Sequence, residues 1–111
     1  MAMERFLQIQ EDNGNFQRAL AELGEGRKQS HWIWYIFPQG IGLGRSKMAI
    51  MYALHGDEIQ EFKSHPILWP RYLTCVGLVR MWENAGRSLL EILGSEIDVL
   101  KYRTSIELFE V

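Results

Sequence analysis

The chain has 111 residues, of which 47% are hydrophobic and 23% charged, and its formal net charge is −2. This length and balance indicate one globular domain with its own core and exclude a disordered chain. The slight negative charge argues against binding a nucleic acid polymer or an anionic membrane. No apolar run approaches the roughly 20 residues that span a bilayer, and the first residues lack a signal-peptide pattern, so a cytoplasmic location is expected.

The first quarter of the chain predicts two helices. A short helix is expected over residues 3–10, and a turn at 12–15 separates it from a second one that ends at Gly24. The second helix carries apolar residues at spacings of four and three: Phe16, Leu20 and Leu23.

The next stretch, GRKQSHWIWYIFPQG at 26–40, is dense in aromatic side chains. Ser30 could cap a short helix through it, and Pro38 would stop that helix. The aromatic and β-branched content favours a strand instead. A helix is preferred because strand partners are scarce elsewhere, but the residues alone leave both alternatives open.

Polar caps mark the next elements. Ser46 is an N-cap candidate for a helix that reaches Leu54, and Asp57 for a helix that ends before His65. The longest apolar segment, residues 69–82, has apolar side chains on two faces, which predicts a central buried helix. Gly77 within it would allow a close helix crossing.

Two further helices complete the prediction. Residues 88–93 read as a helix with Gly94 as its C-cap, and a last helix is expected to begin near Thr104. The fold expected for residues 1–111 is therefore all-α: a single small domain of short helices packed around the central apolar helix.

The stretch GRKQSHWIWYIFPQ, followed by GLGRS, resembles the family known as domain of unknown function 1810. The likeness extends to ERFLQIQ, ALAEL, Tyr52, HPILWPR at 65–71 and ILGS…LKYRTSIELF at 93–109, so it covers nearly the whole chain. The resemblance implies a small, mostly helical fold and carries no established activity. Members of the family usually continue beyond the segment that matches residues 104–110, whereas this chain ends at Val111.

The aromatic block is the first candidate for a ligand site. On a helix, His31, Trp34 and Tyr35 share one side, and an imidazole beside two amphipathic rings suits a pocket wall that stacks a base. The alternative is that these side chains only fill the core. The opposite side carries three residues that are expected in the core: Ile33, Ile36 and Phe37.

The glycine loop GIGLGRSK follows directly. Free backbone N–H groups, a helix start and the side chains of Arg45, Ser46 and Lys47 would suit a phosphate group. The spacing matches neither a dinucleotide fingerprint nor a Walker loop, and a flexible turn with solvated cations is the alternative. Lys101 and Arg103, at the expected start of the last helix, are predicted to reach the same pocket.

The sequence gives little support for a nucleophilic cysteine, a metal site or acid–base catalysis. Cys75 lies in an apolar run, which predicts a buried, inert thiol. The histidines lack the short spacing of metal ligands, so neither a metal site nor a cofactor is expected. Carboxylates such as Glu22, Glu58 and Glu91 are expected on solvated helix faces, and no catalytic residue can be assigned.

This inventory favours a small-molecule binding protein for a phosphorylated, ring-containing ligand such as a nucleotide or an ADP-ribose-like signal. Sequestration without turnover, as by a phage counter-defence protein, is one use of such binding. The alternatives are an enzyme with His31 as acid or base, and a ligand-free structural domain. A homodimer or larger assembly is also expected, because four tryptophans and five methionines crowd a chain too small to bury them all.

Overall fold

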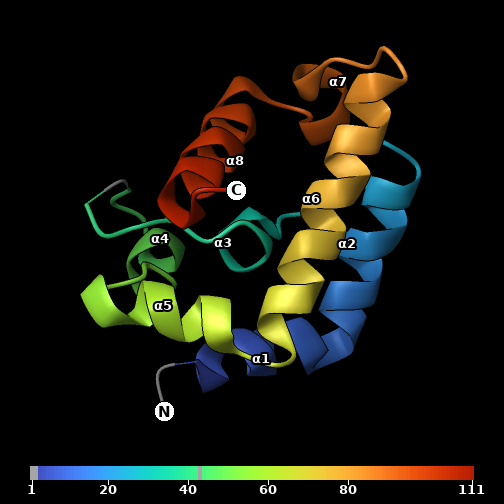
Figure 1. The fold of residues 1–111 in the computed structure, drawn as a ribbon. Helices are drawn as coiled ribbons and strands as arrows, with labels where there is room; N and C mark the ends of the chain where they lie inside the picture. Colours follow the sequence, from blue (N-terminus) through green and yellow to red (C-terminus); the bar gives the residue numbers. More distant parts are fainter. Residues whose placement is uncertain (1–2, 43) are drawn as a thin grey trace.

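In a computed structural model, which describes residues 3–42 and 44–111, the chain forms eight α-helices and one 3-10 helix (Figure 1). Within these described residues there is no strand, apart from an isolated bridge between Gly40 and Leu54. The all-α prediction is therefore confirmed. The elements, in chain order, are α1 (Glu4–Glu11), η1 (Asp12–Gly14), α2 (Asn15–Gly24), α3 (Ile33–Ile36), α4 (Lys47–Met51), α5 (Gly56–Ser64), α6 (Leu68–Asn84), α7 (Leu89–Leu93) and α8 (Glu96–Phe109).

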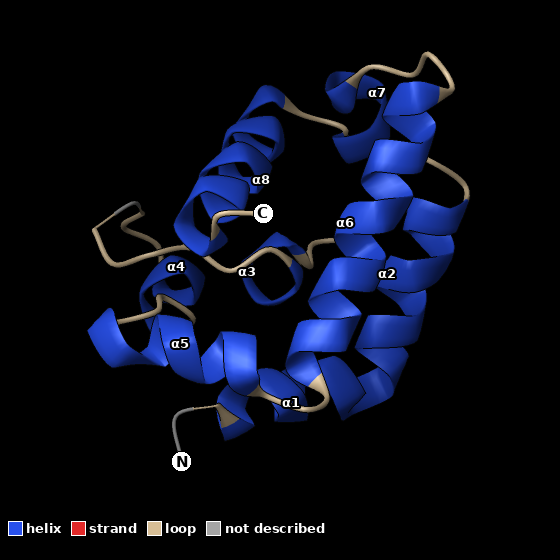
Figure 2. Cartoon of the chain, viewed as in Figure 1, coloured by secondary structure: helices blue, strands red, loops and turns tan. Residues whose placement is uncertain are grey.

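The helices surround the short helix α3. Helix α6 packs against α2, α5 and α7, while α8 packs against α7, α3 and α5. Figure 2 shows that long loops lead into and out of α3, which lies near the middle of the molecule. The aromatic block spans the end of the first loop and α3, and the glycine loop GIGLGRSK leads into α4. No helix in the described ranges has both the length and the apolar character needed to cross a bilayer.

Aromatic rings fill the core where α5, α6 and α8 meet. The ring of Phe109 lies 4.8 Å from that of Tyr72 and 5.1 Å from that of Phe62, measured between centroids. The hydroxyls of Tyr72 and Ser105 share a hydrogen bond of 3.0 Å, which satisfies both polar groups inside the core. Burial raises the pKa of the Tyr72 hydroxyl and raises that of the Cys75 thiol to about 12. The prediction of an inert Cys75 is thus supported.

Helix α6 is the longest helix, as its apolar run predicts, and it packs against three helices while one stripe of its surface faces solvent. Cys75, Val76 and Val79 are buried, whereas Leu73 is 44% exposed and Met81 49% exposed. Gly77 lies on the exposed side with no atom within 4 Å of the place where a Cβ would stand, so no helix crosses there. The prediction of a central buried helix is therefore confirmed, except that Leu73, Gly77 and Met81 face solvent.

The start of the last helix is also corrected. Helix α8 begins at Glu96 rather than near Thr104, and the Ser95 hydroxyl caps it by accepting from the N–H of Asp98 at 3.2 Å. Lys101 and Arg103 therefore lie in the middle of a helix. The apolar periodicity did not indicate the first two turns of α8, because their apolar residues Ile97 and Leu100 face solvent and are 66% and 63% exposed.

His65 joins α5 to α6. It ends α5, as predicted, and its Nδ1 accepts hydrogen bonds from the N–H groups of Ile67 and Leu68, both at 3.1 Å. At the other end of α5 the N-cap position is held by His55, and Asp57, the predicted cap, lies inside the first turn. Two of the amides at the beginning of α6 thus depend on a single imidazole nitrogen.

We expect His65→Ala to lower the free energy of unfolding by about 1 kcal/mol, the usual cost of losing a side-chain cap. His65→Asn should lose less, because the amide oxygen can still accept from the same backbone groups. Urea unfolding followed by circular dichroism measures both variants. Equal losses in the two would mean that the ring's packing, rather than its nitrogen, matters here.

Candidate functional site

The loop before α3 is organised by the carboxylate of Glu22, in the last turn of α2. Glu22 Oε1 accepts from the N–H of Gln29 at 2.7 Å, the N–H of Ser30 at 2.9 Å and the indole N–H of Trp32 at 2.9 Å. Glu22 Oε2 accepts from the Ser30 hydroxyl at 2.6 Å. Burial raises the pKa of this carboxyl, but the four hydrogen bonds lower it by more, so the net shift is downward. The prediction that Glu22 lies on a solvated face is wrong.

Lys28 ties the same loop to the last two helices. Its ammonium lies 2.8 Å from Asp98 Oδ2, donates to the carbonyl of Ser30 and stands 5.0 Å from the centre of the Trp32 ring. The side chain of Lys28 is only 6% exposed. Its backbone N–H also donates to the carbonyl of Ile92 at 2.7 Å. The loop is therefore fixed on one side by α2 and on the other by α7 and α8.

A cavity of about 320 Å³ lies between this loop and the α7–α8 junction, and we call it the His31 cavity. Its lining comes from two segments that are distant in sequence: Lys28, Gln29, Ser30 and His31 from the loop, and Leu93, Gly94, Ser95, Ile97 and Asp98 from the junction. His31 is exposed, so its imidazole is accessible at the cavity. Of the eight predicted site residues, it is the one that belongs to this lining.

The two serine hydroxyls in the cavity each make one hydrogen bond within the protein, and this fixes whether they can donate to a ligand or accept from it. Ser30 donates its proton to Glu22, so towards a ligand it offers an acceptor. Ser95 accepts from the N–H of Asp98, so it offers its proton. The first amides of α8, at Glu96 and Ile97, have no intrahelical acceptor because of their position at the helix start. The cavity therefore presents both donors and acceptors.

Trp34 on α3 and Lys101 on α8 are in contact. The Lys101 ammonium stands 4.7 Å from the centre of the Trp34 ring, a cation–π contact. The indole N–H of Trp34 is buried and has no hydrogen-bond partner among the described residues. Gln39 also binds α8: its amide donates to the carbonyl of Lys101 at 2.6 Å and accepts from the Thr104 hydroxyl at 2.5 Å. We call this set of contacts between residues 28–39 and α8 the seam.

The other predicted site residues lie elsewhere. Tyr35 is buried at 5% exposure, with its ring 6.1 Å from that of Tyr52, and the helix expected from Ser30 is a single turn that leaves His31 outside. The last three residues of the glycine loop are exposed at the start of α4: Arg45, Ser46 and Lys47. Ser46 caps that helix, as predicted, by accepting from the N–H of Ala49. Leu43, within the glycine loop, lies outside the described residues.

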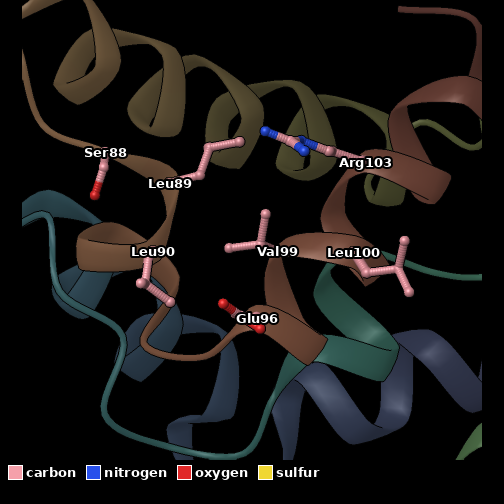
Figure 3. A pocket seen from close by; sticks show the side chains of 7 residues that line it. All are labelled: Ser88, Leu89, Leu90, Glu96, Val99, Leu100 and Arg103. Carbon is pink, nitrogen blue, oxygen red and sulfur yellow. The ribbon is translucent and has the colours of Figure 1, made fainter.

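Arg103 lines a different concavity, the α7–α8 groove (Figure 3). This groove has a volume of about 450 Å³ and is lined by Ser88, Leu89, Leu90, Glu96, Val99, Leu100 and Arg103. A second hollow of about 280 Å³ shares Leu89 and Arg103 with it and extends to Arg80 on α6. The structure therefore separates His31, the Trp34–Lys101 pair and Arg103, so the eight predicted residues do not form one pocket.

Comparison with known proteins places the chain in a family. Residues 1–111 match the family described as protein of unknown function, DUF1810. The chain belongs to this family. Its fold is similar to the crystal structure of a conserved hypothetical protein from Mycobacterium tuberculosis, with a TM-score of 0.89 and 38% sequence identity over 97% of this chain and 74% of that one. No curated protein matches the chain.

Two of the stretches by which the chain resembles the DUF1810 family, at residues 26–39 and 93–109, are in contact along this seam. The loop and α3 contact α8 through the pairs Lys28–Asp98 and Trp34–Lys101. Sequence reasoning missed Glu22, Lys28 and Asp98 as organisers of the loop. One signal was available: Glu22 lies in the last turn of its helix, where the helix dipole disfavours a negative charge, which indicates partners outside the helix.

Proposed function

We propose that this DUF1810 chain binds a small phosphorylated sugar derivative of the nucleotide class in the His31 cavity, without turnover. The observation that carries the proposal is the accessible imidazole of His31 in a polar cavity whose walls are fixed by the Glu22 and Lys28 contacts. Rigid walls favour binding because the polar groups are held in place before a ligand arrives.

The polar groups of the cavity match such a ligand. The Asp98 carboxylate, whose charge is balanced by Lys28, can accept hydrogen bonds from sugar hydroxyls. A phosphate group would find donors in the Ser95 hydroxyl, the His31 imidazole and the first amides of α8, where the positive end of the helix dipole adds attraction. Ile97, which is 66% exposed, offers an apolar surface for a base.

The size of the cavity narrows the ligand class. Its volume of about 320 Å³ is near the lower end of the range for small-molecule pockets, roughly 300–1,000 Å³. A mononucleotide or a ribose phosphate fits this space better than a dinucleotide does. Within the proposal, an ADP-ribose-like signal would place one ribose phosphate in the cavity and leave the rest outside.

We expect ribose 5-phosphate and adenosine monophosphate to raise the melting temperature of the protein, and His31→Ala to weaken their binding roughly 10- to 100-fold, the loss of about one charge-assisted hydrogen bond. Isothermal titration calorimetry gives the affinities. His55→Ala is the matched control, because this exposed histidine on α5 lies outside the cavity lining. Equal affinities for wild type and His31→Ala would contradict the proposal.

The same samples separate binding from turnover. Ligand recovered after incubation should elute unchanged by chromatography if the protein only sequesters it. A converted ligand, with conversion lost in His31→Ala, would support the alternative in which His31 acts as acid or base. If neither probe changes the melting temperature, the ligand class itself is wrong.

A further inference from the structure

The solvent-facing side of α8 carries an unusual stripe. Residues at spacings of four, three and four lie along it, and all of them are exposed: Glu96, Leu100, Arg103 and Glu107. Leu100 is 63% exposed and Leu90, across the α7–α8 groove, is 49% exposed. Two large aliphatic side chains thus flank a groove of about 450 Å³. An exposed apolar groove with a charged rim is typical of an interaction surface.

The charges at the ends of this groove have opposite signs. Figure 3 shows Glu96 and Arg103 projecting from α8 with Val99 between them, and Leu100 on the side away from Leu90. The two charged residues lie equally far, in sequence, from the midpoint between Val99 and Leu100. A second copy of α8 running in the opposite direction would therefore place its Arg103 beside Glu96 and its Glu96 beside Arg103.

We propose that the α7–α8 groove is the interface of a two-fold symmetric homodimer, with the two α8 helices antiparallel and the symmetry axis beside Val99 and Leu100. Each Leu100 then enters the groove of the other copy, next to Leu89 and Leu90. Such an interface is isologous, so one patch serves both copies and the assembly closes as a dimer. The proposal does not depend on any ligand of the His31 cavity.

Charge complementarity selects this register over its neighbour. An axis that paired Arg103 with Glu107 would lie near Ser105 and would move Leu100 away from the centre of the contact. The axis beside Val99 and Leu100 instead puts the apolar residues in the middle and the Glu96–Arg103 pairs at the rim, the usual arrangement of an interface. A partner of uniform charge would repel one end of the groove, whereas a second copy satisfies both ends.

A charge exchange tests the arrangement. The wild-type chain should sediment at twice the monomer mass of 13.0 kDa at high concentration. Glu96→Arg alone and Arg103→Glu alone each place like charges opposite one another, and each should raise the dissociation constant of the dimer by about ten- to a hundredfold. The double variant Glu96→Arg, Arg103→Glu should restore dimerisation, since the same pairs form with reversed polarity.

Two controls separate the interface from the fold. Leu100→Asp should give a monomer with unchanged helical circular dichroism, because Leu100 is exposed in the single chain. Glu25→Arg, an exposed change on another part of the surface, should leave the dimer intact. A wild type that stays monomeric would overturn the proposal and leave the groove to another occupant. A dimer that survives both single charge changes, or that the double variant fails to restore, would also overturn it.

Discussion

Glu22→Ala is expected to lower the free energy of unfolding by about 2–4 kcal/mol, because each buried donor left without an acceptor costs about 1–3 kcal/mol. The change removes the acceptor of two backbone N–H groups, a hydroxyl and the Trp32 indole. Trp32 is 1% exposed, so water cannot readily replace its lost partner. Urea unfolding followed by tryptophan fluorescence measures the loss.

Glu25→Ala is the matched control, since Glu25 is exposed just beyond the same helix and should change stability by no more than about 0.5 kcal/mol. Glu22→Ala should also abolish the ligand binding that we propose for the His31 cavity, because the loop that carries His31 loses its anchor. A Glu22→Ala protein as stable as the Glu25→Ala protein would show that the carboxylate does not organise the loop.

The contribution of Glu22 should also depend on pH. Its folded-state pKa lies below the ordinary value of 4.5, because the hydrogen bonds to the charged form outweigh burial. Its stabilising effect is therefore complete above the unfolded-state pKa and is lost as the pH falls through the lower folded-state pKa. The stability difference between wild type and Glu22→Gln, measured by urea unfolding from pH 7 to pH 3, should be constant at first and shrink below about pH 4.5. A difference that grows on acidification would contradict the assignment.

Gly26→Ala is expected to lower the free energy of unfolding by about 2–4 kcal/mol, the sum of a strained backbone and an overpacked contact. Gly26 has a φ of +71°, and a Cβ there would stand 2.8 Å from two ring atoms of Trp82. The ring cannot easily retreat: its indole N–H donates to the carbonyl of Leu23 at 2.9 Å, and the Arg87 guanidinium lies 4.8 Å from its centre.

Two other glycines allow the cost of backbone strain to be separated from the cost of the contact with Trp82. Gly14 has a φ of +66° but no atom within 4 Å of the position that an added methyl group would take, so Gly14→Ala should cost only the backbone strain of about 1 kcal/mol. Gly24 lies in α2 with similar open space, and Gly24→Ala should be neutral or slightly stabilising. Thermal unfolding ranks the three variants. If Gly26→Ala costs no more than Gly14→Ala, the contact with Trp82 is looser than the structure shows.

Most of the fold could be predicted from the sequence because its signals are local. Ser46 caps a helix, Gly94 ends one with a φ of 88°, and the apolar periodicity located α2 and α6. The first turns of α8 could not be found this way, because their apolar residues face outwards. Likewise, nothing local distinguishes the covered face of α6 from the exposed one, since that depends on which helices pack against it.

The candidate site was harder to predict than the fold, because it is formed by contacts between segments that are distant in sequence. The sequence predicts a ligand role for His31, which stays a prediction, and it indicated that residues 31–35 and the last helix lie together. It could not pair Lys28 with Asp98, because neither position shows a pattern that points to the other. It placed Arg103 with Lys101 although the two project from different sides of α8. Side-chain direction on a helix becomes known only once its boundaries are known.

The seam between residues 28–39 and α8 has a consequence for synthesis on the ribosome. Gln39 and Lys101, which it joins, are 62 residues apart in the chain. The amino-terminal helices can form early and give the loop its contacts with Glu22, but its contacts with α7 and α8 must wait until almost the whole polypeptide has left the exit tunnel. During that interval the Trp34 ring lacks its contact with Lys101. The contacts between residues 28–39 and α8 therefore form late in synthesis.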